Sequence, residues 1–452
     1  MSLDKEWSRR IEAWLAELRR RFYKPLGTIE LEGFATLERL RPEEAAARAF
    51  RPMPPGTEWG AKWEYGWFRG HLELPPGAAG LRIAARLSAG LEALVYVNGA
   101  AAGAVDREHR EITLSRKARG GERFGFLAEF YAGHGPIEEN CGPVAPGGDP
   151  LPEPGAAQRR VESSTWGSWD DLAFALWADA ETLYQTRSVL PETSLLVSDI
   201  DEALRDFARI VDFELPEDAM RDTFRTARVR LGPLLERRNG STAPLMHVFG
   251  NSHLDLAWQW PVEETIRKTA RTMSTQLALL GEYPSYRYLL CQVPLMEMLR
   301  DHYPEIWART RERIAEGSVI VEGGMWLEPD TNLPCGEALI RQIAFAKRFF
   351  REELGRDTKV LWLPDCFGFT AALPQIMKGA GLDYFATKKL IDNYSGGESF
   401  PYTTFAWKGL DGSEVLAHVY RKCNSPIDPK TLARRWNVDR VQKDGIATYL
   451  FP

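Results

Sequence analysis

Residues 245–293 read LMHVFGNSHLDLAWQWPVEETIRKTARTMSTQLALLGEYPSYRYLLCQV, and their pattern indicates the fold class of the carboxyl-terminal half of the chain. An apolar run, LMHVFGN, precedes a longer segment, EETIRKTARTMSTQLALLGEY, in which apolar side chains recur at helical spacing. A second apolar run, YRYLLCQV, follows. Strand, helix and strand in this order predict a parallel βαβ unit. Ligands of parallel sheets bind at the carboxyl ends of the strands, so functional residues are expected just after the apolar runs.

The same alternation continues toward the carboxyl end of the chain. Three further apolar runs, SVIVEGG (318–324), VLWLP (360–364) and YFATKKL (384–390), are separated by segments of helical periodicity. Strands that alternate with helices over this length predict an α/β domain. We assign it to residues 241–452.

The sequence before residue 241 has a different texture. Apolar residues at helical spacing near the amino terminus predict a helical segment over residues 1–50. Short alternating segments such as WEYGWFRGHLEL and ALVYVNG, separated by Pro-Pro-Gly and Asn-Gly turns, predict a β-sandwich domain over residues 51–195. Helical periodicity returns in a predicted linker over residues 196–240. The chain is therefore predicted to be a multidomain protein, as its 452 residues favour.

Composition excludes several classes of partner. The formal net charge of −6, with no basic stripe, argues against nucleic acid and anionic lipid. No apolar run approaches membrane-spanning length, and the charged amino terminus does not resemble a secretory signal. The cysteines are odd in number and widely scattered, which favours reduced thiols and a cytoplasmic location. They are Cys141, Cys291, Cys335, Cys366 and Cys423.

His253 and Asp255 follow the first apolar run directly. Residues two apart in an extended segment project to the same side, so an imidazole and a carboxylate could reach one cation. The alternative is a hydrogen-bonded His-Asp pair with Asp255 as a helix cap. Asp365 follows another predicted strand, where a poorly solvated carboxylate needs a cation or several donors, or acts as a turn residue.

A third strand end carries the sequence VEGGMWLEPDTNLP. Trp326 beside Glu328, Asp330 and Asn332 suits a sugar, because its ring face stacks while its hydroxyls require polar partners. The alternative is a surface turn in which Asp330 accepts a local hydrogen bond. Taken jointly, the three strand ends predict a metal-assisted hydrolase that acts on a carbohydrate.

Three strings around these residues resemble the α-mannosidases of glycoside hydrolase family 38. They are NSHLDLAWQWPVEETIRKTART (251–272), GGMWLEPDTNLPCGEALIRQ (323–342) and WLPDCFGFTAALPQIMKGAGLDYFATKKL (362–390). Upstream, WFRGHLELP and ALVYVNG are similar to the amino-terminal β domain of the cytosolic and bacterial branch. The resemblance implies a catalytic domain of the seven-stranded, incomplete-barrel type.

The resemblance also implies roles for individual residues. One zinc ion would be held by His253, Asp255 and Asp365, and Asp365 would attack the anomeric carbon of an α-mannoside with net retention of configuration. Trp258 and Phe367 would form part of the apolar wall of the sugar site. The substrate would be an α-mannoside or a mannose-containing oligosaccharide, and a homo-oligomer is compatible with the resemblance.

Two parts of the family's active site are missing from the sequence. The general acid and a fourth metal ligand, a histidine, lie beyond the corresponding point in similar proteins, so we expect a truncated and nearly inactive catalytic domain. His418 is a weak substitute as a ligand, and Cys366 is expected to serve in packing.

Two other functions fit part of the pattern. A metal-dependent polysaccharide deacetylase would use a histidine and an aspartate at strand ends to activate water. A non-catalytic carbohydrate-binding or assembly fragment would need no complete site. The long GGMWLEPDTNLP segment has no evident use in a deacetylase, which favours the α-mannosidase.

Overall fold

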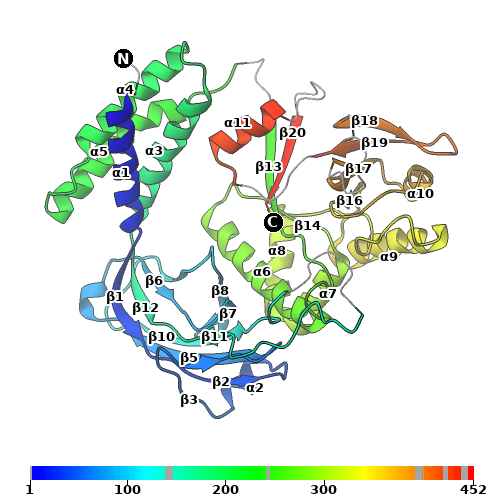
Figure 1. Ribbon diagram of the computed structural model, residues 1–452, viewed down its shortest axis with the longest axis horizontal. Helices are drawn as coiled ribbons and strands as arrows, with labels where there is room; N and C mark the ends of the chain where they lie inside the picture. Colours follow the sequence, from blue (N-terminus) through cyan, green and yellow to red (C-terminus); the bar gives the residue numbers. More distant parts are fainter. Residues whose placement is uncertain are drawn as a thin grey trace.

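The chain folds into a helical bundle, a β-sandwich and an α/β region, as a computed structural model shows (Figure 1). The bundle lies at the upper left, the sandwich below it and the α/β region at the right. The structure describes residues 3–137, 146–240, 245–391, 400, 402–420, 426–438 and 446–451.

The β-sandwich consists of two antiparallel sheets that pack face to face around one apolar core. The first sheet has the order β1-β12-β6-β9 and the second the order β3-β2-β5-β10-β7-β8. The first comprises β1 (Tyr23–Ile29), β12 (Ser164–Trp169), β6 (Ile83–Arg86) and β9 (Ile112–Ser115). The second comprises β3 (Arg51–Pro52), β2 (Glu32–Thr36), β5 (Tyr65–Glu73), β10 (Arg123–Tyr131), β7 (Glu92–Val97) and β8 (Ala100–Val105). The short strands β4 (Glu58–Trp59) and β11 (Arg159–Arg160) pair separately.

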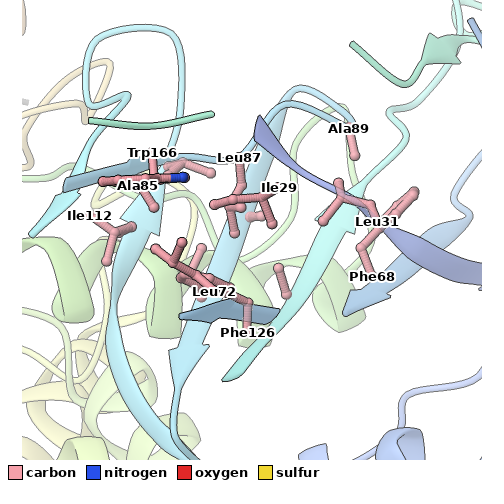
Figure 2. Close-up of a cluster of buried hydrophobic side chains, with 14 of the residues drawn as sticks. Ile29, Leu31, Phe68, Leu72, Ala85, Leu87, Ala89, Ile112, Phe126 and Trp166 are labelled. Atoms are coloured by element: carbon pink, nitrogen blue, oxygen red, sulfur yellow. The ribbon is translucent and has the colours of Figure 1, made fainter. Parts of the chain in front are cut away.

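Alternating side chains of these strands build the sandwich core. Figure 2 shows Ile29, Phe68, Phe126 and Trp166 pointing into the space between the sheets, where each is less than a tenth exposed. Residues of the opposite parity face outward, as the period of two in a strand requires. The predicted β-sandwich is therefore confirmed.

The prediction of a helical segment over residues 1–50 was only partly right. The helix α1 (Lys5–Arg20) begins after Asp4, whose carboxylate accepts the backbone N–H groups of Glu6 and Trp7. Strands β1 and β2 and the short helix α2 (Pro42–Ala46) follow within the same segment. β1 pairs with β12, more than a hundred residues later, so local periodicity gave no signal for it.

The predicted linker over residues 196–240 belongs to a packed bundle. Helices α3 (Asp171–Val189), α4 (Leu195–Ile210) and α5 (Glu217–Leu235) share one core with α1. α3 begins inside the segment assigned to the sandwich, after Asp170 caps its first turn. Buried Ile11 of α1, Phe207 of α4 and Phe224 of α5 show why these helices assemble: each has one apolar stripe to cover.

The α/β region contains the predicted parallel strands. β13 (Leu245–Asn251) pairs with β14 (Tyr288–Leu290), β14 with β15 (Val319–Val321), and β16 (Val360–Leu363) with β17 (Tyr384–Thr387), all in parallel. β20 (Ile446–Phe451) and β19 (Glu414–Val419) extend the two sheets in parallel, and β18 (Thr404–Lys408) is antiparallel to β19. A single parallel bridge between Gly323 and Leu361 joins the two sheets. The seven-stranded incomplete barrel stays a prediction.

Helices connect these strands as the sequence pattern predicts. They are α6 (Val262–Glu282), α7 (Val293–His302), α8 (Pro304–Glu316), α9 (Gly336–Leu354), α10 (Leu373–Gly379) and α11 (Pro429–Val438), with the 3-10 turn η2 (Lys389–Ile391) after β17. The other 3-10 turn, η1 (Pro76–Ala78), lies in the sandwich between β5 and β6. Both α8 and α9 end at glycines in the left-handed conformation, Gly317 and Gly355. Within the described ranges, no helix is long and apolar enough to cross a membrane.

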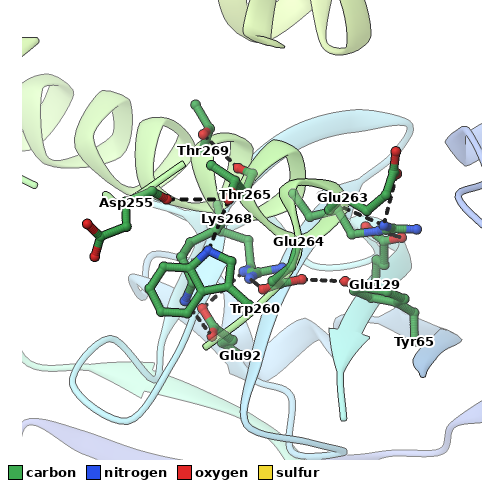
Figure 3. Close-up of polar contacts among 12 residues, drawn as sticks. Tyr65, Glu92, Glu129, Asp255, Trp260, Glu263, Glu264, Thr265, Lys268 and Thr269 are labelled. Carbon is green, nitrogen blue, oxygen red and sulfur yellow. Dashed lines mark hydrogen bonds and ion pairs between the residues drawn. The ribbon is translucent and has the colours of Figure 1, made fainter. Parts of the chain in front are cut away.

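The sandwich packs on α6 through its six-stranded sheet. Trp67, Leu94 and Tyr96 of that sheet share an apolar cluster with Met273 and Leu277 of α6. Beside this cluster, charged residues of α6 meet charged residues of β7 and β10, as Figure 3 shows. α6 begins shortly after the loop that carries His253 and Asp255, so the sandwich supports that loop from behind.

Replacing Gly323 with alanine is expected to destabilise the protein by about 2–4 kcal/mol. Its φ of 147° is rarely adopted by other residues, and a Cβ there would lie 2.2 Å from the carbonyl oxygen of Cys291. Gly336→Ala is the control, because a Cβ at Gly336 meets no atom within 4 Å. Urea unfolding curves measure both changes, and equal midpoints for the two variants would contradict the prediction.

Candidate functional site

The three predicted metal ligands converge at the carboxyl ends of the parallel strands. His253 and Asp255 lie in the loop after β13, and Asp365 lies just after β16. One ligand atom from each residue lies within 4.8 Å of the other two. His253 Nε2 is 3.5 Å from Asp255 Oδ1 and 3.9 Å from Asp365 Oδ2. The predicted convergence is therefore confirmed by the geometry, and an N,O,O donor set of this kind suits a divalent metal.

His253 offers a buried nitrogen to this cluster. Its Nε2 atom is buried and makes no hydrogen bond, which is costly for a polar atom unless another partner occupies the space. Burial opposes the charge on the imidazole, but the carboxylates of Asp255 and Glu328 outweigh it and raise the pKa of His253 to about 10. The surroundings of Nε2 thus favour a positive charge, which a metal ion would also supply.

Both the side chain and the backbone of Asp365 make polar contacts. Its side chain is 37% exposed, and its Oδ1 atom accepts a charge-assisted hydrogen bond from Lys389 Nζ at 2.9 Å. Its backbone N–H donates to Glu328 Oε2 at 3.1 Å. Oδ2 faces His253, so the two oxygens of one carboxylate have different neighbours.

The loop with His253 and Asp255 is fixed to the first turns of α6. Thr265 Oγ1 donates to the carbonyl oxygen of Leu256 at 2.7 Å, and Trp260 Nε1 donates to Thr265 Oγ1 at 2.9 Å. Figure 3 shows Asp255, Trp260 and Thr265 together at this end of the helix. The alternative prediction, in which Asp255 is the amino-terminal cap of α6, is wrong, because α6 begins at Val262 after Pro261 and has no side-chain cap.

The predicted sugar-site residues divide into two groups. Trp258 and Phe367 are 54% and 67% exposed, so their rings are accessible. Trp326 instead packs edge-on against Phe345 and Phe349 of α9, with ring centroids 6.5 and 6.3 Å apart. A role of Trp326 in sugar binding stays a prediction.

Asp330 adopts the alternative that the sequence left open. Its carboxylate accepts the backbone N–H of Asn332 at 3.1 Å, which is a local turn, and the residue is exposed. A role of Asp330 in sugar binding stays a prediction. His418, on β19, exchanges a hydrogen bond with Thr404 at 2.9 Å and is not one of the three clustered ligands.

Cys366 serves in packing, as expected. It is buried in an apolar cluster, its thiol lies 3.0 Å from the carbonyl oxygen of Pro329, and burial raises the pKa of the thiol. Cys291, Cys335 and Cys366 are free thiols. Cys141 and Cys423 lie outside the described residues.

Sequence reasoning missed two residues of the site, Glu328 and Lys389. In the sequence Glu328 is one of several polar residues after Trp326, and its contact with His253 depends on a bend at Gly323 and Gly324 that no periodicity reveals. Lys389 follows β17, and its ammonium group also lies 4.2 Å from the centre of the Phe367 ring. The position of Lys389 directly after a predicted parallel strand could have indicated a residue of the site.

Comparison with known proteins identifies two domains in the chain. Residues 243–446 match the Glycosyl hydrolases family 38 N-terminal domain, and residues 26–147 match the Alpha-mannosidase, jelly roll domain. The chain is 32% identical to Alpha-mannosidase 2C1 of Homo sapiens over 394 residues, which cover 86% of this chain and 36% of that protein. It is 39% identical to Alpha-mannosidase of Saccharomyces cerevisiae over 183 residues, which cover 40% of this chain and 17% of that protein. The chain thus spans well under half the length of these curated relatives.

Proposed function

The chain belongs to glycoside hydrolase family 38, and from this premise we propose that it serves in the hydrolysis of terminal α-mannosidic bonds with retention of configuration. Asp365 is the nucleophile, and His253, Asp255 and Asp365 hold one zinc ion. The observation that carries the proposal is the convergence of these three side chains at the strand ends of the matched domain. The unpartnered Nε2 atom of His253 supports a metal at this position.

The residues divide the chemistry among them. The Asp365 carboxylate attacks the anomeric carbon as the bond from that carbon to the leaving oxygen breaks and that oxygen takes up a proton. Water later cleaves the glycosyl ester, which gives mannose, the free Asp365 carboxylate and one proton, so the two steps balance. The zinc ion, when bound, supplies Lewis acidity and a grip on sugar hydroxyls. Lys389 orients the Asp365 carboxylate through its Oδ1 atom, and Trp258 and Phe367 offer ring faces for stacking. We assign no general acid among the described residues.

The substrate class follows from the relatives, which are named α-mannosidases. We propose an α-mannoside or a mannose-containing oligosaccharide. We also propose that the protein is located in the cytoplasm, and the free thiols of Cys291, Cys335 and Cys366 support this location.

Trapping with 5-fluoro-α-mannosyl fluoride in the presence of zinc tests this function. Fluoride departs without protonation, so the label can form without a general acid, and the reagent keeps the 2- and 3-hydroxyls of mannose. We expect the peptide containing Asp365 to gain the mass of one fluoromannosyl group. The Asp365→Asn variant, which lacks the anionic nucleophile, is expected to stay unlabelled.

Two outcomes would redirect the proposal. Hydrolysis of an aryl α-mannoside without any label on Asp365 would argue against a covalent intermediate at this residue. Release of acetate from an acetylated polysaccharide, again without the label, would favour the metal-dependent deacetylase. A zinc-loaded chain that is neither labelled nor active, yet binds mannose, would favour a carbohydrate-binding role.

A further inference from the structure

Glu328 connects two of the three clustered side chains. Its Oε1 atom accepts a hydrogen bond from His253 Nδ1 at 3.0 Å, and its Oε2 atom accepts the backbone N–H of Asp365 at 3.1 Å. The Glu328 side chain is 10% exposed. One carboxylate therefore holds the imidazole after β13 and the aspartate after β16 in a fixed relation.

The contact with Glu328 determines which nitrogen of His253 carries the proton. An ionised carboxylate only accepts hydrogen bonds, so Nδ1 must be the donor. In neutral His253 the lone pair then lies on Nε2, the atom that faces Asp255 and Asp365 and has no hydrogen-bond partner. The imidazole is thus oriented toward the space between the carboxylates.

We propose that Glu328 is the positioning residue of the metal centre: it orients His253 through Nδ1 and holds the Asp365 backbone so that both ligands face one cation. This inference rests on the metal site of the proposed function and adds a residue to it. Glu328 itself is not one of the three clustered ligands, and its two oxygens accept hydrogen bonds from His253 and Asp365, so we assign it no direct contact with the metal. Carboxylates that accept a hydrogen bond from a metal-bound histidine commonly raise metal affinity by about 10- to 100-fold.

Glu328→Gln separates the two hydrogen bonds of Glu328. A glutamine has one carbonyl oxygen and one amide NH₂, so it cannot accept from His253 Nδ1 and from the Asp365 N–H with different atoms. We expect the dissociation constant for Zn²⁺, measured by competition with a chromophoric chelator, to rise about 10- to 100-fold. The visible absorption bands of the Co²⁺-loaded protein are expected to shift as well, because the ligand set is reoriented.

Glu322→Gln is the matched control. Glu322 also accepts backbone N–H groups of the neighbouring segment, those of Lys359 and Val360 at 3.1 Å each, and the hydrogen bond that His253 Nδ1 makes goes to Glu328 instead. A purely structural role of Glu328 would therefore affect the melting temperature as Glu322→Gln does and leave zinc affinity unchanged. Glu328→Asp is a second variant that keeps the charge but shortens the reach, and it is expected to weaken zinc binding without introducing a donor.

The outcomes separate the inference from the proposed function. Unchanged zinc affinity in folded Glu328→Gln and Glu328→Asp overturns the inference, and so does a wild-type chain that binds no zinc. Weaker zinc binding in both variants, in a wild-type chain whose Asp365 resists the fluorosugar, supports the inference while the glycosidase proposal fails.

Discussion

The His253→Ala variant is expected to lose zinc almost completely, with a fall in affinity of at least about 100-fold, beyond the range typical of supporting residues. His253 provides the one nitrogen of the cluster, and its Nε2 atom faces the carboxylates of both Asp255 and Asp365. Without the imidazole, two aspartates remain as ligands, and catalytic zinc sites commonly use three protein ligands. The fluorosugar label on Asp365 is expected to disappear together with the metal.

His247→Ala is the control for this experiment. His247 lies on β13, six residues before His253, and is exposed. Metal content by atomic emission and a zinc titration distinguish the two variants, and the melting temperature measured with and without zinc gives a second readout. One tightly bound zinc ion in His253→Ala would place the metal elsewhere in the chain.

Replacing Arg271 with leucine is expected to lower the free energy of unfolding by about 3–5 kcal/mol. Arg271 is buried on α6, where it binds Glu264 of the same helix and lies 3.1 Å from Glu92 of the sandwich. Burial disfavours the charge of Glu92, but Arg271 and Lys268 outweigh this effect and leave the pKa of Glu92 lowered. Without Arg271, two carboxylates in the interface lose a cation that water cannot replace.

A double variant tests this explanation. Among the described residues, three carboxylates and three cations of this interface have side chains at most 20% exposed, namely Glu92, Glu129, Glu264, Arg267, Lys268 and Arg271. Adding Glu264→Gln to Arg271→Leu restores equal numbers, so the double variant is expected to be more stable than Arg271→Leu alone. Arg228→Leu removes a partly exposed pair with Asp179, in which the arginine side chain is 42% exposed, and is expected to cost about 1 kcal/mol. Urea unfolding followed by tryptophan fluorescence compares them, and equal losses for Arg271→Leu and Arg228→Leu would refute the explanation.

The sequence could predict the position of those site residues that directly follow a parallel strand. His253 and Asp365 each follow an apolar run, and parallel strands bring such positions to one edge. The resemblance of three sequence motifs to glycoside hydrolase family 38 also implied that His253, Asp255 and Asp365 are the metal ligands. The ring contact of Trp326 with Phe349 could not be predicted, because Trp326 lies on an irregular bend where no period defines the direction of a side chain.

Other features depended on contacts that local patterns do not encode. β1 pairs with a strand more than a hundred residues away, and Glu92 and Glu129 read as ordinary surface charges until the sandwich meets α6. Arg267, the partner of Glu129, is 2% exposed although its sequence neighbourhood is polar. Such matched pairs are visible only once two domains are placed against each other.

The charged interface between the sandwich and α6 has a consequence for how the two domains change over evolution. Glu92 and Glu129 belong to one domain and their cations to the other, so a substitution that removes one charge is expected to destabilise the protein unless a second substitution across the boundary compensates it. Chimaeras that exchange the jelly-roll domain between relatives should therefore fold only when the donor carries acidic residues at these two positions. We expect the two domains to be inherited together, so that the packing which supports the loop before α6 is kept.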